Sequence, residues 1–223
     1  MRSLRDPLVA QALTIAVGVG AFGVAFGVFA ADTGLSLAKA LALSGLVYGG
    51  SAQLAAVGVI AEGGTGAAAV LGGLLLSART LAFGVALAPL LPGSLARRLA
   101  ASQLIVDQSA AVALAERDPD RARRAFWLTS LWMLVLWLAG TAAGWGLTGA
   151  VDVRAVGLDA AIPAVFVALL APRLRRPAEA ATALTGAAIA LALTPVAPAG
   201  LPILLASLGV VAGLAVARRR PAS

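Results

Sequence analysis

Long, nearly uncharged apolar runs dominate this sequence, and their length decides what the chain can fold into. A helix rises 1.5 Å per residue, so about 20 apolar residues cross a hydrocarbon core that is roughly 30 Å thick. The sequence is 61% hydrophobic and only 12% charged, which is too apolar for a domain in water. The apolar runs are 8–31, 41–60, 66–92, 99–115, 125–149, 156–171, 178–194 and 201–217. They predict an all-α, polytopic membrane helical bundle, built as a single transmembrane domain over residues 1–223.

The residue types that are missing exclude most catalytic chemistry. The chain has no Cys and no His, which excludes disulfides, thiolate metal sites and imidazole-dependent catalysis. We therefore expect no enzyme activity, no metal and no cofactor. The net charge of +7 comes from cations in short loops beside apolar runs, with no basic stripe interleaved with aromatic residues. This pattern predicts membrane orientation rather than nucleic-acid binding.

The positive charges of the loops predict the topology, because cytoplasmic loops carry an excess of Lys and Arg. If all eight runs cross from a cytoplasmic N-terminus, twelve loop and tail cations lie inside and four outside: Lys39, Arg97, Arg98 and Arg154. If runs 41–60 and 99–115 instead enter and leave on one side, the split becomes fourteen to two. We prefer this second interpretation. It gives about six full spans plus two re-entrant or broken helical hairpins, with both termini cytoplasmic.

A weak internal similarity supports the two hairpins. Residues 44–52 and 102–110 match at four of nine aligned positions. In the re-entrant arrangement, 8–60 and 66–115 each contain a spanning helix followed by a hairpin, in opposite orientations, and 125–217 adds further transmembrane helices. Inverted repeats of this kind bring interrupted helices together near the membrane midplane, where transporters bind their solutes. Coincidence among common small residues is the alternative explanation.

Glycines spaced by four recur within the apolar runs. These pairs are Gly23/Gly27, Gly45/Gly49, Gly140/Gly144 and Gly209/Gly213. Small residues at this spacing let helix backbones approach closely in lipid. We therefore predict helix contacts at these positions.

Three charged residues fall inside or near the inner part of an apolar run: Arg79, Asp107 and Asp159. A charge at the centre of a spanning helix costs roughly 2.5–3.5 kcal/mol on insertion scales, so each is a functional candidate. Arg79 is a candidate to receive a carboxylate, or it forms a structural ion pair with an Asp. Asp107 follows Gln103 by four residues, so we expect both on one helical face, with Gln108 adjacent. This face would bind a solute or a proton; a cytoplasmic amphipathic hairpin is the alternative.

Two sequence features predict interruptions of helices. Run 41–60 is interrupted by Gly49, Gly50, Ser51 and Gln53. An unwound turn there would expose backbone N–H groups that suit a carboxylate, whereas tight helix packing is the alternative. Pro163 leaves the carbonyl of Asp159 without its helical donor. A carboxylate beside a free carbonyl predicts a cation or ammonium site, with a helix N-cap as the alternative.

Several segments of the chain carry a family resemblance. In chain order they are FGVAFGVFAADTGLS, YGGSAQLAAVGVIAEGG, LLLSARTLAFG, IVDQSA and GLDAAIPAVFVALL. With them the chain resembles the AzlC family of branched-chain amino-acid permeases over most of residues 10–172. The resemblance implies the large subunit of a secondary transporter in a bacterial inner membrane. Such a transporter exports or otherwise moves branched-chain or other small apolar amino acids, together with a small AzlD-like membrane partner.

The chain departs from the family pattern at two titratable positions. The pattern Asn-x-Arg-His around Arg79 reads Ser-Ala-Arg-Thr here, and the Glu that is common after Asp107 is Gln108. Any proton or cation coupling would therefore depend on Asp107 or Asp159.

The sequence as a whole predicts a transporter that holds an amino acid near the membrane midplane. The predicted substrate-binding residues are Gly49, Gly50, Ser51, Gln53, Arg79, Gln103, Asp107, Gln108 and Asp159, with a helix break at Pro163. Helix N–H groups or Arg79 would bind the carboxylate, Asp107 or Asp159 the ammonium group, and apolar walls the side chain. The alternative is a non-transporting membrane scaffold or a regulatory subunit of a transport complex, in which the intramembrane charges only pair with one another.

Overall fold

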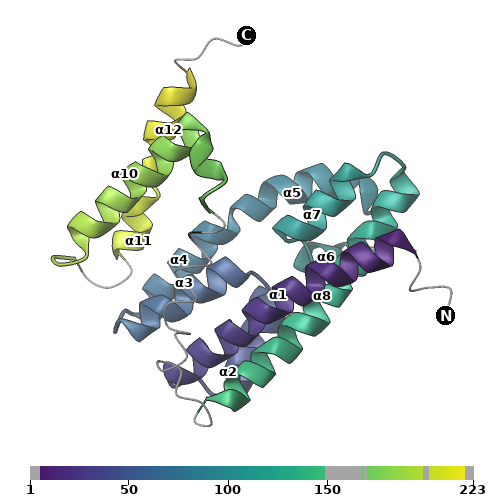
Figure 1. Ribbon diagram of the computed structural model, residues 1–223, viewed down its shortest axis with the longest axis horizontal. Helices are drawn as coiled ribbons and strands as arrows, with labels where there is room; N and C mark the ends of the chain where they lie inside the picture. The colour runs from purple at the N-terminus through teal and green to yellow at the C-terminus, as the bar shows by residue number, and fades with distance from the viewer. Residues whose placement is uncertain (1–5, 149–166, 168–169, 198–200, 219–223) are drawn as a thin grey trace. The chain divides into compact units, whose positions relative to one another are not determined.

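The computed structural model describes residues 6–148, 167, 170–197 and 201–218 (Figure 1). These residues fold into helices joined by turns, which confirms the all-α membrane class. They divide into two compact units, which are described one at a time. Unit 1 covers Met1–Leu54 and Leu76–Val153, and unit 2 covers Ala55–Leu75 and Arg154–Ser223.

Two helices of the described chain are long and apolar enough to cross a membrane unaided. They are α1 (Pro7–Asp32) and α8 (Pro119–Leu147), both in unit 1, and they confirm the predicted runs 8–31 and 125–149. Helix α8 begins earlier than its apolar run because the charged residues before the run are helical as well. An Asp N-cap followed by Pro in the first turn starts each helix.

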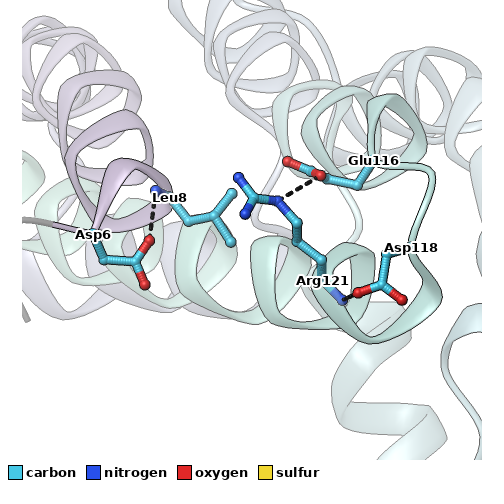
Figure 2. A network of polar contacts seen from close by, with 5 residues as sticks. All are labelled: Asp6, Leu8, Glu116, Asp118 and Arg121. Carbon is cyan, nitrogen blue, oxygen red and sulfur yellow. Dashed lines mark hydrogen bonds and ion pairs between the residues drawn. The ribbon is translucent and has the colours of Figure 1, made fainter.

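The N-terminal ends of α1 and α8 carry a network of polar contacts (Figure 2). The Asp6 carboxylate accepts a hydrogen bond from the Leu8 N–H at 3.0 Å, and the Asp118 carboxylate accepts one from the Arg121 N–H at 3.1 Å. The Arg121 side chain also pairs with Glu116 at 2.7 Å. Exposed ion pairs contribute only about 0–1 kcal/mol each, so the caps do most to define where these helices begin.

Helices α1 and α8 run parallel, in contact along their length. Near their starts, Arg124 pairs with Asp6 at 2.6 Å. Near their ends, a Cβ atom added to Gly27 would lie 2.8 Å from the backbone nitrogen of Trp145. Both helices therefore start on the same side of the membrane, and the chain between them has to cross back an odd number of times.

Glycines make this close approach possible. A Cβ atom on Gly23 would lie 2.8 Å from a backbone oxygen of α8, and Cβ atoms on Gly27, Gly140 and Gly144 would also collide with the facing backbone. The packing prediction for Gly23/Gly27 and Gly140/Gly144 is confirmed. It is wrong for Gly45/Gly49, because no described atom lies within 4 Å of a Cβ placed on Gly45.

Run 41–60 is a broken helix, as predicted. Helix α2 (Leu37–Ala42) continues into a π-helical segment, η2 (Leu43–Val47), and α3 (Gly50–Ala61) starts afresh. Between them Tyr48 has a φ of 44°, the left-handed region that glycine usually occupies. A non-glycine residue in such a conformation costs of order 1–3 kcal/mol, so surrounding contacts have to hold it there.

Run 99–115 is also broken. It forms α6 (Leu95–Gln103) and α7 (Asp107–Ala115), and Val106 between them is extended, with φ −133° and ψ 169°. In the alignment of residues 44–52 with 102–110, the two interruptions fall at corresponding places, although the inverted repeat itself stays a prediction.

The chain turns back between α6 and α7, and α7 packs against α8 (Figure 1). Just before α6, the Leu90 carbonyl accepts from Arg123 Nε at 3.0 Å, near the start of α8. At the tip, the Leu104 carbonyl accepts from Ser130 Oγ at 3.2 Å, near the middle of α8. Just past α7, Glu116 pairs with Arg121, so the chain there lies again beside the start of α8. The structure therefore supports the re-entrant interpretation of 99–115 over a full span.

The remaining predicted run of the first half, 66–92, is interrupted at Ala78. It forms α4 (Gly66–Ser77) and α5 (Arg79–Leu87), followed by a short 3-10 turn, η3 (Ala88–Leu90). Counted as one bent span, this pair would be the third membrane-crossing segment of the described chain.

Unit 2 contains the helices of the C-terminal runs. A short 3-10 turn, η4 (Arg173–Arg175), precedes α10 (Pro177–Leu193), and α11 (Leu201–Ala206) and α12 (Gly209–Arg218) follow it. Helix α12 packs on α10: Cβ atoms on Gly209 and Gly213 would each lie 2.7 Å from backbone atoms of α10, which confirms that predicted pair. Most of run 156–171 lies outside the described residues.

Candidate functional site

The middle of unit 1 contains polar side chains that are fully shielded. Six polar residues of the described chain have 0% exposure: Ser44, Gln53, Ser109, Thr129, Ser130 and Thr141. They come from the first broken helix, the second broken helix and α8. We call this region the break junction: residues 43–53 and 103–109 together with residues 129–141 of α8.

The first broken helix is bonded to α8 at two levels. The hydroxyls of Ser44 and Thr141 share a hydrogen bond of 2.9 Å. Deeper along α8, the Tyr48 hydroxyl donates to the Ser130 carbonyl at 3.1 Å. These bonds hold the left-handed Tyr48 in place and so maintain the interruption before α3.

The second broken helix reaches the same level of α8 from the other end. The Leu104 carbonyl, released by the end of α6, accepts from Ser130 Oγ at 3.2 Å and from Ser109 Oγ at 3.1 Å. The Ser109 hydroxyl oxygen also accepts from the Val106 N–H at 3.0 Å. Ser130 is thus linked to both interruptions, through its carbonyl to Tyr48 and through its hydroxyl to Leu104.

Gln103 joins the two interruptions directly. Its Nε2 donates to the Gly45 carbonyl at 3.1 Å and to the Leu46 carbonyl at 2.6 Å, 58 and 57 residues away in the chain. Backbone carbonyls released within a membrane need partners, because hydrocarbon offers none. A side chain at the end of one broken helix therefore caps the other.

The start of α3 contains four predicted site residues and a fifth group that the sequence did not indicate. Gln53 is fully buried, and its Nε2 donates to the Leu43 carbonyl at 3.0 Å. The indole of Trp137 lies against Gly50, with its Cη2 atom 3.1 Å from a Cβ placed there. Gly49 and Ser51 flank Gly50 at the interruption. Glycine at position 50 therefore makes room for an aromatic ring rather than for a helix backbone.

The predicted common face of Gln103 and Asp107 is wrong. Gln103 is the last residue of α6 and Asp107 the first of α7, so the interruption between them removes the helical i, i+4 relation. Asp107 is partly buried, whereas Gln108 is exposed. Arg79 begins α5, which packs against α7, so the positions of Arg79 and Asp107 belong to neighbouring helices. Asp159 and Pro163 lie outside the described residues.

Sequence reasoning missed the hydroxyls that hold the junction together. Ser130 and Thr141 lie eleven residues apart, three helical turns, on the same face of α8 as the glycines that meet α1. A row of small and hydroxyl residues on one face of an apolar helix was the available signal. Among the described residues, no group of three or more His, Cys, Asp or Glu could hold a metal ion.

A comparison with known protein families matches residues 14–151 to AzlC protein, which is more than half of the chain. The chain belongs to the AzlC family. The match begins inside α1 and ends just past α8, so it includes every helix of the break junction. AzlC proteins are associated with amino-acid transport, and theirs is a transporter-type family rather than an enzyme family. Comparisons with curated proteins and with solved structures gave no match.

Proposed function

We propose that this AzlC protein is a secondary transporter that exports branched-chain or other small apolar amino acids. The observation that carries the proposal is the break junction, where two interrupted helices entering from opposite ends of α8 meet near its middle. Discontinuous helices at such a depth present N–H groups and carbonyls to a solute while the surrounding helices remain apolar. Gln103 and Ser130 hold this arrangement together.

The chemistry of the proposed site suits a zwitterion with an apolar side chain. The N-terminal end of α3, at Gly49, Gly50 and Ser51, carries the positive end of a helix dipole and would receive the carboxylate, with Arg79 as a further cation. Asp107 would attract the ammonium group, and Asp159 is the second candidate for that role. Gln53, Gln103 and Gln108 complete the proposed polar lining.

The same carboxylates carry the proposed coupling. Export against a gradient needs an ion, and Asp107 or Asp159 would take up the proton or cation that accompanies the amino acid. The proposal includes a small AzlD-like membrane partner and a place in the bacterial inner membrane with both termini cytoplasmic. The cation-rich starts of α1 and α8, which share one side of the bundle, support this orientation.

Transport measurements test the proposal. Export of valine and leucine would be followed in cells that lack other exporters, with the protein produced together with its AzlD-like partner. Arg79→Ala, Gln53→Ala and Asp107→Asn should each reduce the flux strongly at equal protein levels. Thr14→Ala is the control, because its exposed hydroxyl bonds only to the carbonyl one turn earlier in α1. Unchanged flux in all three site variants would remove the proposed site.

A further inference from the structure

The start of α3 holds a buried acceptor with an unused oxygen. Gln53 Oε1 is shielded and has no hydrogen-bond partner among the residues that the structure describes. The amide orientation is fixed by chemistry, because only the nitrogen end can donate to the Leu43 carbonyl at 3.0 Å. A buried acceptor without a donor costs about 1–3 kcal/mol, so a group that supplies a donor would be favoured there.

A buried donor lies on the same face of α3. The indole Nε1–H of Trp137 has no acceptor within the described part of the chain. The Trp137 ring covers Gly50, and Gly50 and Gln53 are three residues apart, so they share one face of the helix. Side chains of a helix point back toward its N-terminus, which directs the Gln53 amide to the interruption. One unused acceptor and one unused donor therefore flank the start of α3.

The helix end between them adds donors of its own. The first hydrogen bond of α3 runs from the Gln53 N–H to the Gly49 carbonyl at 2.8 Å. The N–H groups of Gly50 and Ala52 consequently have no acceptor within α3 itself. Together with the helix dipole and the Trp137 N–H, they suit an anion, whereas Gln53 Oε1 suits a cation with N–H groups.

We infer that Gln53 Oε1 accepts a hydrogen bond from the amino group of the solute, while the carboxylate of the solute binds at the start of α3 beside Trp137 Nε1. The inference rests on the proposed function and deepens it. An ammonium group has three donors, so Gln53 acts in addition to an Asp carboxylate. Gln53 is fully buried, so the solute reaches it only when the groups that cover it move apart.

Pairing protein variants with solute analogues tests this assignment. Binding of leucine to the full-length protein with its partner would be measured by equilibrium dialysis, and binding of 4-methylpentanoate, which lacks the amino group, by competition. Removing a hydrogen bond to a charged group usually weakens binding about tenfold to a hundredfold. Gln53→Met should weaken leucine by that factor and leave 4-methylpentanoate unchanged, whereas Trp137→Phe should weaken both alike.

Control measurements separate binding from folding. Thr14→Ala should bind leucine like the wild type, because the exposed Thr14 hydroxyl bonds only to the carbonyl one turn earlier in α1 and lies outside the break junction. If Gln53→Met does not fold, N,N-dimethylleucine replaces the variant. Its ammonium group keeps the charge that an Asp attracts but has a single N–H to donate, so the wild type should bind it at least about tenfold more weakly than leucine, and equal affinity would overturn the assignment.

The outcomes distinguish this inference from the proposed function. If the wild type binds no amino acid, both fail. If the wild type binds leucine but Gln53→Met binds it equally well, or loses leucine and 4-methylpentanoate by the same factor, the amino-group assignment alone is wrong.

Discussion

The contact between α1 and α8 makes a quantitative prediction about two glycines of one helix. A Cβ atom on Gly144 would lie 2.8 Å from the Val24 carbonyl carbon and closer still to the Val24 oxygen. No described atom lies within 4 Å of a Cβ on Gly146. Ordinary contact begins at 3.4 Å, so Gly144→Ala requires the two backbones to separate by about 0.6 Å or more. Gly146→Ala requires no movement.

The comparison isolates packing from helix propensity. Both glycines lie in the last turn of α8, so the advantage of Ala over Gly, at most roughly 1 kcal/mol, is similar for the two and largely cancels. Overpacking of a well-packed contact costs typically 1–3 kcal/mol. The free energy of unfolding of Gly144→Ala should therefore be lower than that of Gly146→Ala by about 1–3 kcal/mol, a factor of roughly 5 to 150 in the unfolding equilibrium.

Unfolding in micelles with increasing denaturing detergent measures this difference. The four tryptophans of the chain all lie in α8, so their fluorescence reports on this helix directly. The double variant Gly27→Ala with Gly144→Ala should cost less than the sum of the single variants, because one separation of the helices relieves both collisions. Equal stability of Gly144→Ala and Gly146→Ala would refute the interlocked arrangement of α1 and α8.

Three further predictions concern the break junction and the hairpin. Gln103→Met should lower the free energy of unfolding by about 1–3 kcal/mol, because the Gly45 and Leu46 carbonyls lose their donor. Gln108→Met is the control and should change this free energy by no more than about 0.5 kcal/mol. Equal losses in the same detergent titration would contradict the capping role of Gln103. Ser130→Ala should destabilise the protein by about 1 kcal/mol in thermal unfolding, because the Leu104 carbonyl loses a donor. Thr129→Val should be neutral or stabilising, because Thr129 Oγ1 has no partner among the described atoms. The reverse order would show that the junction is bonded differently. Arg97→Cys should react with a membrane-impermeant thiol reagent only from the side on which α8 begins; labelling from the opposite side would exclude the α6–α7 hairpin.

Much of the fold follows from the sequence because length and polarity are local properties. The two strongest spans and the interruption of run 41–60 were readable from apolar runs and from the residues that break them. The position of the interruption in run 99–115 was not. The preference for a re-entrant 99–115 came from the placement of Arg97 and Arg98. It agrees with the bonds of Leu90 and Leu104, on either side of α6, to α8 and with the packing of α7 on α8. The inverted repeat stays a prediction.

The candidate site was less accessible to such reasoning. The assumption that Gln103 and Asp107 share a face treated a broken helix as continuous, and the interruption lies between them. The roles of Ser130 and Tyr48 depend on each other across 82 residues, which no local pattern records. The left-handed backbone falls on Tyr48 rather than on the neighbouring glycines, and the Tyr48 hydroxyl bonds to α8.

The sequence by itself determines that this protein folds in a membrane and where its two longest apolar helices lie. Both depend on how residues that are close in the chain partition between lipid and water. Tertiary structure alone decides that the two interruptions meet. Carbonyls released inside a membrane need hydrogen-bond donors. Gln103 and Ser130 supply these donors from helices that are distant in the chain. The glycine contact between α1 and α8 and the hairpin of α6 and α7 bring the donors within reach.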